Sequence, residues 1–212
     1  MGRKVVAPLR REQILNGLFL AMSKKGFEAV SITDIAKEAG VTRGILHYYF
    51  TNKDEMLVEL MRSISEIYVR RLNRFISKEK TPLDKLSAFF RFHTIGEEQE
   101  VHALTGVWVE YWGKAAGGHS AGEVIANLQA KLRGLIEEIF KEGIRDGSIT
   151  GVDPAAASAV ILGAVEGILL QWRVNSKAIN LSSVLGELEK IVKCMGCSQI
   201  NADRSAKNGK NR

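Results

Sequence analysis

Helical periodicity runs through almost the whole chain, and no stretch alternates apolar and polar residues for long enough to predict a strand. Apolar residues recur three and four positions apart, which places them on one face of an amphipathic helix. The expected helices cover residues 10–26, 31–39, 42–50, 53–77, 82–95, 97–114, 120–145, 154–173 and 181–193. The sequence therefore predicts an all-α fold of about nine helices.

Capping and turn residues set several of these limits. Ser31 and Thr42 can accept a hydrogen bond from the N–H groups that are free at the start of a helix. Gly26 and Gly40 can adopt the left-handed backbone conformation that ends a helix. Asp153, followed by a proline, is a typical helix start.

Length and composition exclude several classes of protein. The 212 residues suit one domain, or a small domain joined to a larger one. The two cysteines exclude a disulfide-stapled secreted scaffold, and the basic N-terminus lacks the apolar stretch of a secretory signal. Residues 154–172 are largely apolar but contain Ser158, Glu166 and Gln171, which favours a buried helix over a membrane span. We therefore expect a cytoplasmic protein without a membrane partner.

Positive charge is concentrated at the two ends of the chain. Residues 1–53 contain 9 Lys and Arg against 4 Asp and Glu, residues 54–192 contain 16 against 19, and residues 193–212 contain 5 against 1. A basic N-terminal quarter on a mildly acidic body indicates a polyanionic partner at that end. The polar and basic residues 196–212 predict a disordered tail.

Residues 31–53 read SITDIAKEAGVTRGILHYYFTNK, which predicts two short helices joined by a turn at Gly40. Ala36 is small, as a close crossing of two helices needs, and Gly40 can reverse the chain without steric cost. This pattern is typical of a helix-turn-helix, whose second helix enters the DNA major groove by its N-terminal end. Similar pairs occur in all-α proteins that bind no DNA, and the charge asymmetry is what favours DNA binding here.

Side chains at that end of the second helix suit contacts with DNA. Arg43 can reach a phosphate or a guanine edge, and Ile45 can meet a thymine methyl group. Lys53 opens the next helix, where its charge and the free N–H groups together favour a phosphate. The expected DNA contacts are Thr33, Lys37, Thr42, Arg43, Gly44, Ile45, His47, Tyr48 and Lys53.

Residues 10–57 closely resemble the N-terminal domain of the TetR family of transcriptional regulators. The matching residues are Ile14, Gly26-Phe27, Ser31, Ile35-Ala36, Ala39-Gly40-Val41-Thr42, Gly44, Leu46, Tyr49-Phe50 and Lys53-Asp54. His47 stands where the family usually has a tyrosine that contacts phosphate, although an imidazole can still donate a hydrogen bond. The resemblance implies an all-α homodimer that a small ligand releases from a double-stranded DNA operator. It also implies a DNA-binding domain over residues 1–52 and an effector-binding and dimerisation domain over residues 53–195.

Aromatic side chains in the C-terminal part can line an effector pocket. Trp108 and Trp112 lie four residues apart with Tyr111 beside them, an arrangement that can hold a cation or a flat apolar molecule. The two tryptophans give a loose similarity to the subgroup that senses choline or its aldehyde. Aromatic residues at helical spacing are, however, more often core residues. The candidate pocket residues are Phe89, Phe92, His93, Trp108, Tyr111, Trp112 and Trp172.

Small residues recur every four positions at Ala159, Gly163 and Gly167. Glycine within a helix costs about 1 kcal/mol relative to alanine, so a packing role explains the stripe. In the family the last two helices form a four-helix bundle between subunits. This implies an interface of Ala159, Gly163, Gly167, Leu181, Leu185 and Leu188. The alternative is that the stripe packs against helices of its own subunit.

No catalytic set of Ser, His and Asp, no metal-ligand cluster and no phosphate-binding loop is recognisable, so we expect neither an enzyme, a metal nor a cofactor. Cys194 and Cys197 form a C-x-x-C, but a structural zinc site needs a second pair of ligands, and free thiols are therefore expected.

Two functions remain from the sequence. One is a homodimeric repressor that an unknown small molecule releases from a palindromic operator. The other is a DNA-bound structural protein, linked to cell division, that needs no small ligand. Either would act in a cytoplasm of bacterial type, at the nucleoid.

Overall fold

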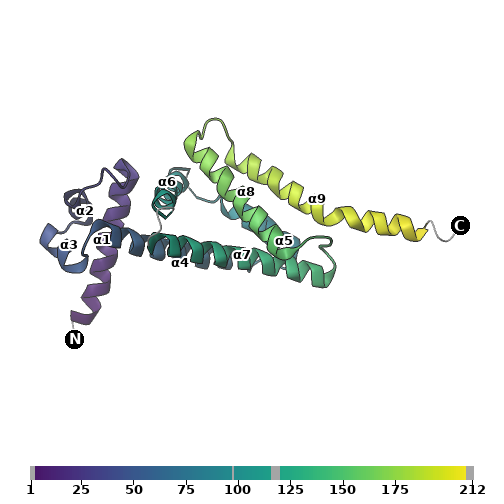
Figure 1. Ribbon diagram of the computed structural model, residues 1–212, viewed down its shortest axis with the longest axis horizontal. Helices are drawn as coiled ribbons and strands as arrows, with labels where there is room; N and C mark the ends of the chain where they lie inside the picture. The colour runs from purple at the N-terminus through teal and green to yellow at the C-terminus, as the bar shows by residue number, and fades with distance from the viewer. Residues whose placement is uncertain (1–2, 97, 116–119, 209–212) are drawn as a thin grey trace. The chain divides into compact units, whose positions relative to one another are not determined.

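The structure, a computed structural model, describes the backbone of residues 3–96, 98–115 and 120–208, and the side chains of residues 8–96, 103–113 and 122–194. These residues form nine helices and no strand, which confirms the all-α fold (Figure 1). In chain order the helices are α1 (Arg3–Lys25), α2 (Ile32–Ala39), α3 (Arg43–Tyr49), α4 (Lys53–Ile76), α5 (Pro82–Phe92), α6 (Glu98–Ala115), α7 (Ser120–Asp146), α8 (Pro154–Val174) and α9 (Leu181–Asn208).

The predicted caps are present at the starts of three helices. The Ser31 hydroxyl accepts a hydrogen bond from the Asp34 N–H at 3.1 Å, and the Thr42 hydroxyl accepts one from the Ile45 N–H at 3.3 Å. The Asp153 carboxylate accepts hydrogen bonds from the first N–H groups of α8. Each cap satisfies backbone donors that the helix itself leaves free.

Two helices are longer than the sequence predicted. α1 begins at Arg3 and contains Pro8. A proline within a helix removes one backbone hydrogen bond, and here the helix continues on both sides of it. α9 continues past Lys193 to Asn208, through much of the segment for which we predicted disorder. Glycine and proline are the residues least favourable within a helix, and residues 194–208 contain one glycine, Gly196, and no proline. The sequence therefore permits the helix to continue there. Residues 209–212 of the predicted tail lie outside the described residues.

The chain forms two compact units. The first contains α1, α2 and α3, which we call the three-helix head, together with α4 as far as Tyr68, α6, and α7 as far as Asn127. One apolar cluster fills this unit, and α6 contributes Val107 and Tyr111 to it. The head contributes residues that include Ile14, Leu18, Phe27, Ile35 and Leu46.

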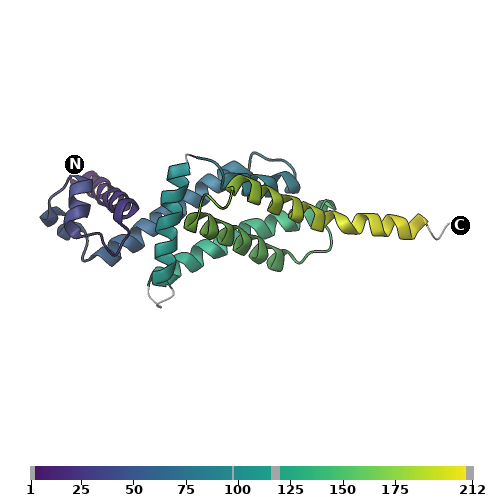
Figure 2. The ribbon, with the colours of Figure 1, turned by 90° about the horizontal axis from the view of Figure 1, so that it is seen from above.

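The second unit contains α4 from Val69, α5, α7 from Leu128, α8 and α9. Within it, α9 packs along α5 and α8 (Figure 2). Its buried side chains include Leu86, Phe89, Ile136, Phe140, Leu162, Val165, Trp172 and Leu185. The two units thus differ from the predicted division at residue 52, because α6 packs with the head although it lies far along the chain.

Candidate functional site

Backbone hydrogen bonds around Gly40 build the turn between α2 and α3. Gly40 has a φ of 63°, in the left-handed region, and its N–H donates to the Lys37 carbonyl at 3.2 Å. The Val41 N–H donates to the Ala36 carbonyl at 2.9 Å. Because Thr42 then caps α3, the chain passes from one helix to the next within three residues, as a helix-turn-helix requires.

The exposed surface of this motif carries most of the residues predicted to contact DNA. Thr33 and Lys37 are exposed on α2, and the exposed residues at and after the start of α3 are Thr42, Arg43, Gly44, Ile45, His47 and Tyr48. Tyr48 is 82% exposed, whereas Leu46 is fully buried. Leu46 therefore anchors α3 to the core while a large aromatic side chain is left available to a partner.

Lysines of α1 neutralise the acidic residues of α2. Lys25 pairs with Asp34 at 2.6 Å, and Lys24 pairs with Glu38 at 2.7 Å. The Lys25 ammonium, together with the Ser31 hydroxyl and N–H, holds the pKa of the Asp34 carboxyl well below its usual range. These pairs are neutral overall, so the positive charge offered to a polyanion near α2 and α3 comes from residues such as Lys37 and Arg43.

Arg11 of α1 clamps the end of α3 and the second turn of α4. Its Nε donates to Glu59 Oε1 at 2.9 Å, one terminal nitrogen donates to the other oxygen of Glu59, and the second terminal nitrogen donates to the Tyr49 carbonyl at 2.8 Å. The guanidinium carbon lies 4.3 Å from the centre of the Phe50 ring. The hydrogen bond that Arg11 donates to Glu59 raises the pKa of Arg11 further, so the guanidinium stays charged. Arg11 was not among the predicted site residues.

Lys53, for which the sequence predicts a phosphate contact, makes several contacts within its own subunit. Its Nζ donates to the carbonyls of Phe27 at 2.8 Å, Val30 at 3.0 Å and Glu28 at 3.4 Å, and it lies 4.3 Å from the centre of the Phe27 ring. An ammonium group has three N–H donors, and these three carbonyls match that number. Lys53 therefore ties the start of α4 to the loop between α1 and α2.

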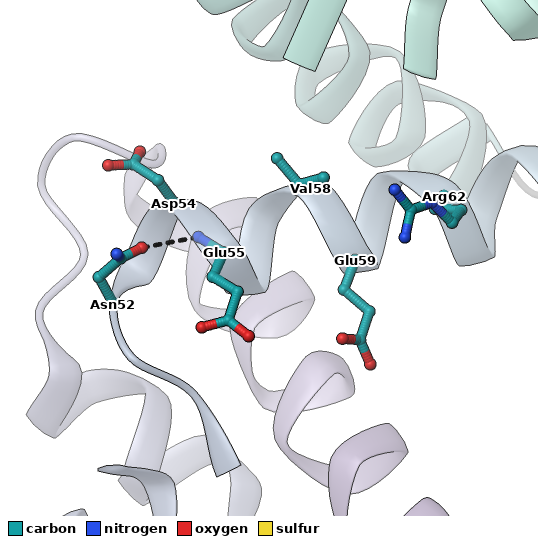
Figure 3. Close-up of a pocket in the computed structure, with 6 residues that line it drawn as sticks. All are labelled: Asn52, Asp54, Glu55, Val58, Glu59 and Arg62. Carbon is teal, nitrogen blue, oxygen red and sulfur yellow. Dashed lines mark hydrogen bonds between the residues drawn. The ribbon is translucent and has the colours of Figure 1, made fainter. Parts of the chain in front are cut away.

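An open hollow of about 400 Å³ adjoins the first turns of α4, lined by Asn52, Asp54, Glu55, Val58, Glu59 and Arg62 (Figure 3). The Asn52 side chain accepts a hydrogen bond from the Glu55 N–H at 2.8 Å, and the Glu55 carboxylate accepts one from the Thr51 N–H at 2.7 Å. This second bond lowers the pKa of Glu55. Since Glu59 binds Arg11, two of the carboxylates in the hollow have structural roles.

Four of the predicted pocket residues lie in the second unit. Phe89 and Phe92 are on α5, His93 caps its C-terminal end, and Trp172 is buried on α8. The Phe89 and His93 rings meet edge to face with centroids 5.0 Å apart, and His93 Nδ1 lies 2.9 Å from the Phe89 carbonyl. Burial lowers the pKa of His93 to about 4, so the ring is neutral near pH 7. This cluster is packed in the interior of the second unit.

The other three, Trp108, Tyr111 and Trp112, lie on α6 in the first unit. Tyr111 is fully buried, Trp108 meets it edge to face at 6.4 Å, and Trp112 is 44% exposed. Burial raises the pKa of Tyr111 to about 12. Its hydroxyl has no hydrogen-bond partner among the described residues.

The predicted dimer residues lie on α8 and α9 of the second unit. Ala159 and Gly163 are exposed and Gly167 is half-buried, and a Cβ added at either glycine would meet nothing within 4 Å in the described part of the chain. Apolar neighbours on α8 are also exposed, with Val160 at 69% and Val174 at 79%. On α9, Leu181 and Leu188 are half-buried, whereas Leu185 is buried within its own subunit. The stripe therefore does not pack against the described helices of its own subunit.

Within the described residues, α8 is the one helix long and apolar enough to cross a membrane, by length and composition alone. A core helix or an interface helix of the same length would have the same composition. Its buried positions, which include Ser158, Ile161, Leu162 and Val165, alternate with the exposed ones at helical spacing. The helix thus has one face inside the unit and one outside.

In the part of the chain that the structure describes, no group of three or more His, Cys, Asp or Glu side chains is placed to hold a metal ion. Cys194 is exposed on α9, and the side chain of Cys197 lies outside the described residues.

Two family models match the chain over separate ranges. The model described as bacterial regulatory proteins, tetR family, matches residues 14–60, which include α2 and α3. The model described as BetI-type transcriptional repressor, C-terminal, matches residues 82–189, about half of the chain.

Individual proteins agree with these models. The fatty acid metabolism regulator protein of Bacillus subtilis is 23% identical over 175 residues, 80% of this chain and 86% of that protein. The nucleoid occlusion factor SlmA of Vibrio atlanticus is 26% identical over 164 residues, 76% of this chain and 82% of that protein. A solved structure of a transcriptional regulator from Saccharomonospora viridis in complex with choline has a TM-score of 0.77 at 16% identity, over 86% of this chain and 95% of that one.

The exposed helix-turn-helix, the all-helical C-terminal part and both family models agree with one another. The chain belongs to the TetR family of transcriptional regulators.

Proposed function

We propose that this protein is a homodimeric repressor that binds a palindromic operator and is released from it by a small effector molecule. The observation that carries the proposal is the exposed surface of α3, where Arg43 and Ile45 lie in the first turn after the capped start and Tyr48 lies farther along the helix. Arginine reads guanine bidentately, and an apolar side chain reads the thymine methyl group, so this surface suits sequence-specific contact in the major groove. A TetR regulator of this kind acts in the cytoplasm, on the chromosome.

The effector would act by shifting a population. It must bind better to the form of the dimer whose two heads are wrongly spaced, because equal affinity for both forms would release nothing. Two heads that read a palindrome must lie about 34–36 Å apart, or a multiple of one DNA turn. Residues 53–195 would bind the effector and form the dimer, while residues 1–52 contact the operator.

The proposal is tested with the DNA upstream of the protein's own gene, by fluorescence anisotropy at two salt concentrations. We expect specific binding that weakens steeply with salt, with two subunits or a multiple of two on each site. Binding no tighter than that to random DNA would contradict a local operator. Addition of the effector should then weaken binding by about 5–150-fold, the usual range of allosteric coupling.

Arg43→Ala should weaken operator binding by about 1–3 kcal/mol and relax the choice of base at one position, because it removes a direct contact with a base edge. Lys37→Ala should instead weaken operator and random DNA alike and reduce the salt slope by about 1, because it removes a phosphate contact. Lys177→Ala, an exposed lysine in the loop between α8 and α9, is the control and should change neither. The assignment of α3 as the recognition helix fails if Arg43→Ala binds the operator like the wild type.

Gly163→Leu should abolish dimerisation while the subunit stays folded. A side chain at Gly163 meets nothing in the described part of its own subunit, and leucine is a better helix former than glycine, so the isolated subunit gains stability. A close helix from a second subunit would, however, collide with the new side chain. Sedimentation velocity should show a monomer for Gly163→Leu and a dimer for Gly134→Leu, a matched change on α7 that also meets nothing within 4 Å. If Gly163→Leu were still a dimer, the stripe of Ala159, Gly163 and Gly167 would not be part of the interface.

A DNA-bound structural role is the second candidate, and the similarity to the nucleoid occlusion factor favours it. Such a protein would need no effector and would bind many sites along a chromosome. Genome-wide selection of bound sites separates the two functions, because a repressor should occupy few sites close to promoters.

A further inference from the structure

α6 belongs to the C-terminal part of the chain by sequence and to the three-helix head by packing. The C-terminal family model covers residues 82–189, which include α6, whereas the first compact unit joins α6 to the head. Val107 and Tyr111 lie in the same apolar cluster as Phe27 and Leu18 of the head. A movement of α6 would therefore change the packing of the head's apolar cluster.

Glu110 of α6 makes a hydrogen bond to the loop between α1 and α2. The Phe27 N–H donates to Glu110 Oε2 at 2.7 Å. The other carboxylate oxygen, Oε1, lies 2.7 Å from the place where a Cβ of residue 26 would be, and Gly26 has a φ of 77°. The backbone conformation at position 26 favours glycine, and a Cβ there would also displace the Glu110 carboxylate from its present place.

The same loop is held from its other side by Lys53. The ammonium group of Lys53 binds the carbonyls of Phe27 and Val30, as described above. Phe27 therefore offers its N–H to α6 and its carbonyl to α4, so residues 26–30 form a short bridge between the two helices. α3 ends at Tyr49 and α4 begins at Lys53, so only three residues join the two helices. A change in the position of Lys53 would therefore also change the position of α3, the recognition helix.

Space for such a change exists beside the bridge. An open hollow of about 500 Å³ is lined by residues of this loop and by Glu110 and Gly113 of α6. A Cβ added at Gly113 would meet nothing within 4 Å. The side of α6 that carries Gly113 is therefore open next to the loop.

We propose that Glu110 is the positioning residue through which α6 sets the orientation of the three-helix head on the operator. The hydrogen bond from Phe27 to Glu110 keeps residues 26–30 seated on Lys53, and this holds α3 in the arrangement that binds DNA. The inference deepens the proposed function and rests on it, since it assigns the contact by which the C-terminal part would regulate DNA binding.

The test uses the full chain and three variants, Glu110→Ala, Glu110→Gln and the matched control Gly113→Ala. Amide hydrogen exchange reports on residues 26–30, and fluorescence anisotropy reports on the DNA fragment that the wild type selects. Thermal unfolding followed by circular dichroism checks that each variant is folded, which we expect because Glu110 is exposed.

Glu110→Ala should exchange the Phe27 amide roughly tenfold faster, because a hydrogen bond to a charged acceptor is lost. Operator affinity should fall by about 3–30-fold, because the binding-competent arrangement of the head is less populated. The salt slope should stay unchanged, since no phosphate contact is removed. Glu110→Gln keeps an acceptor oxygen and should restore most of the affinity, and Gly113→Ala should match the wild type.

The inference is overturned if Glu110→Ala binds the operator as tightly as the wild type or more tightly, or if Glu110→Gln is as impaired as Glu110→Ala. An unchanged rate of exchange at Phe27 would also overturn it. Failure of the proposed function looks different, because the wild type itself would then select no DNA fragment.

Discussion

Gly17→Ala should destabilise the three-helix head by about 1–3 kcal/mol or more, the usual cost of forcing an extra carbon into a packed interior. A Cβ at position 17 would lie 2.6 Å from the Cβ of Ala39, 2.7 Å from its nitrogen and 2.9 Å from its Cα. Two of these three atoms are backbone, so no side-chain rotation can relieve the collision. Gln13 holds the same crossing of α1 and α2, because its side-chain nitrogen donates to the Ala39 carbonyl at 2.6 Å.

Urea unfolding followed by circular dichroism measures this effect, and DNA binding should be lost in parallel because α2 positions α3. Gly134→Ala is the matched control, since it is the same change within a helix but meets nothing within 4 Å. The control should stabilise the chain by up to about 1 kcal/mol, the helix propensity difference between the two residues. Stabilisation of both variants would mean that α1 and α2 do not cross this closely in solution.

Arg11→Ala should destabilise the head by about 2 kcal/mol, between the small effect of an exposed ion pair and the larger effect of a buried one. The side chains of Arg11 and Glu59 are 34% and 30% exposed, which is why an intermediate cost is expected. The substitution leaves the Glu59 carboxylate and the Tyr49 carbonyl without the guanidinium and removes a cation from the Phe50 ring. Since Tyr49 is the last residue of α3, operator affinity should fall with stability.

Arg11→Lys separates charge from geometry. Lysine keeps the positive charge but cannot reproduce the two-pronged bond to Glu59 or the planar contact with Phe50, so most of the loss should remain. Lys24→Ala removes the more exposed pair between α1 and α2 and should cost no more than about 1 kcal/mol. A variant Arg11→Ala with the thermal stability of Lys24→Ala would show that the clamp contributes little.

The parts of the fold that follow local rules were predictable from sequence. Ser31, Thr42 and Asp153 each cap a helix through atoms two or three residues away, so a short stretch of sequence contains the whole interaction. The exposure of Arg43 and Tyr48 also follows from helical spacing, because Leu46 must face the core.

The interactions that position this motif were not predictable, because they join residues far apart in the chain. Arg11 and Glu59 are 48 residues apart, and Phe27 and Glu110 are 83 residues apart. The phosphate contact predicted for Lys53 stays a prediction, and its hydrogen bond to the Phe27 carbonyl, 26 residues away in the chain, was not predictable from its place at a helix start. Ala36, the small residue expected between α2 and α3, is buried, whereas the close approach of Gly17 to Ala39 between α1 and α2 was not predicted.

The sharing of α4 and α6 with the head bears on how regulators of this kind can be recombined. A chimera that joined residues 1–52 to another effector domain would lose Lys53, Glu59 and Glu110, and with them the partners of Phe27, Val30 and Arg11. A transferable DNA-binding cassette must instead extend to Tyr68 and bring a compatible α6 with it. New pairings of operator and inducer therefore have to be selected together with the residues that face the loop between α1 and α2.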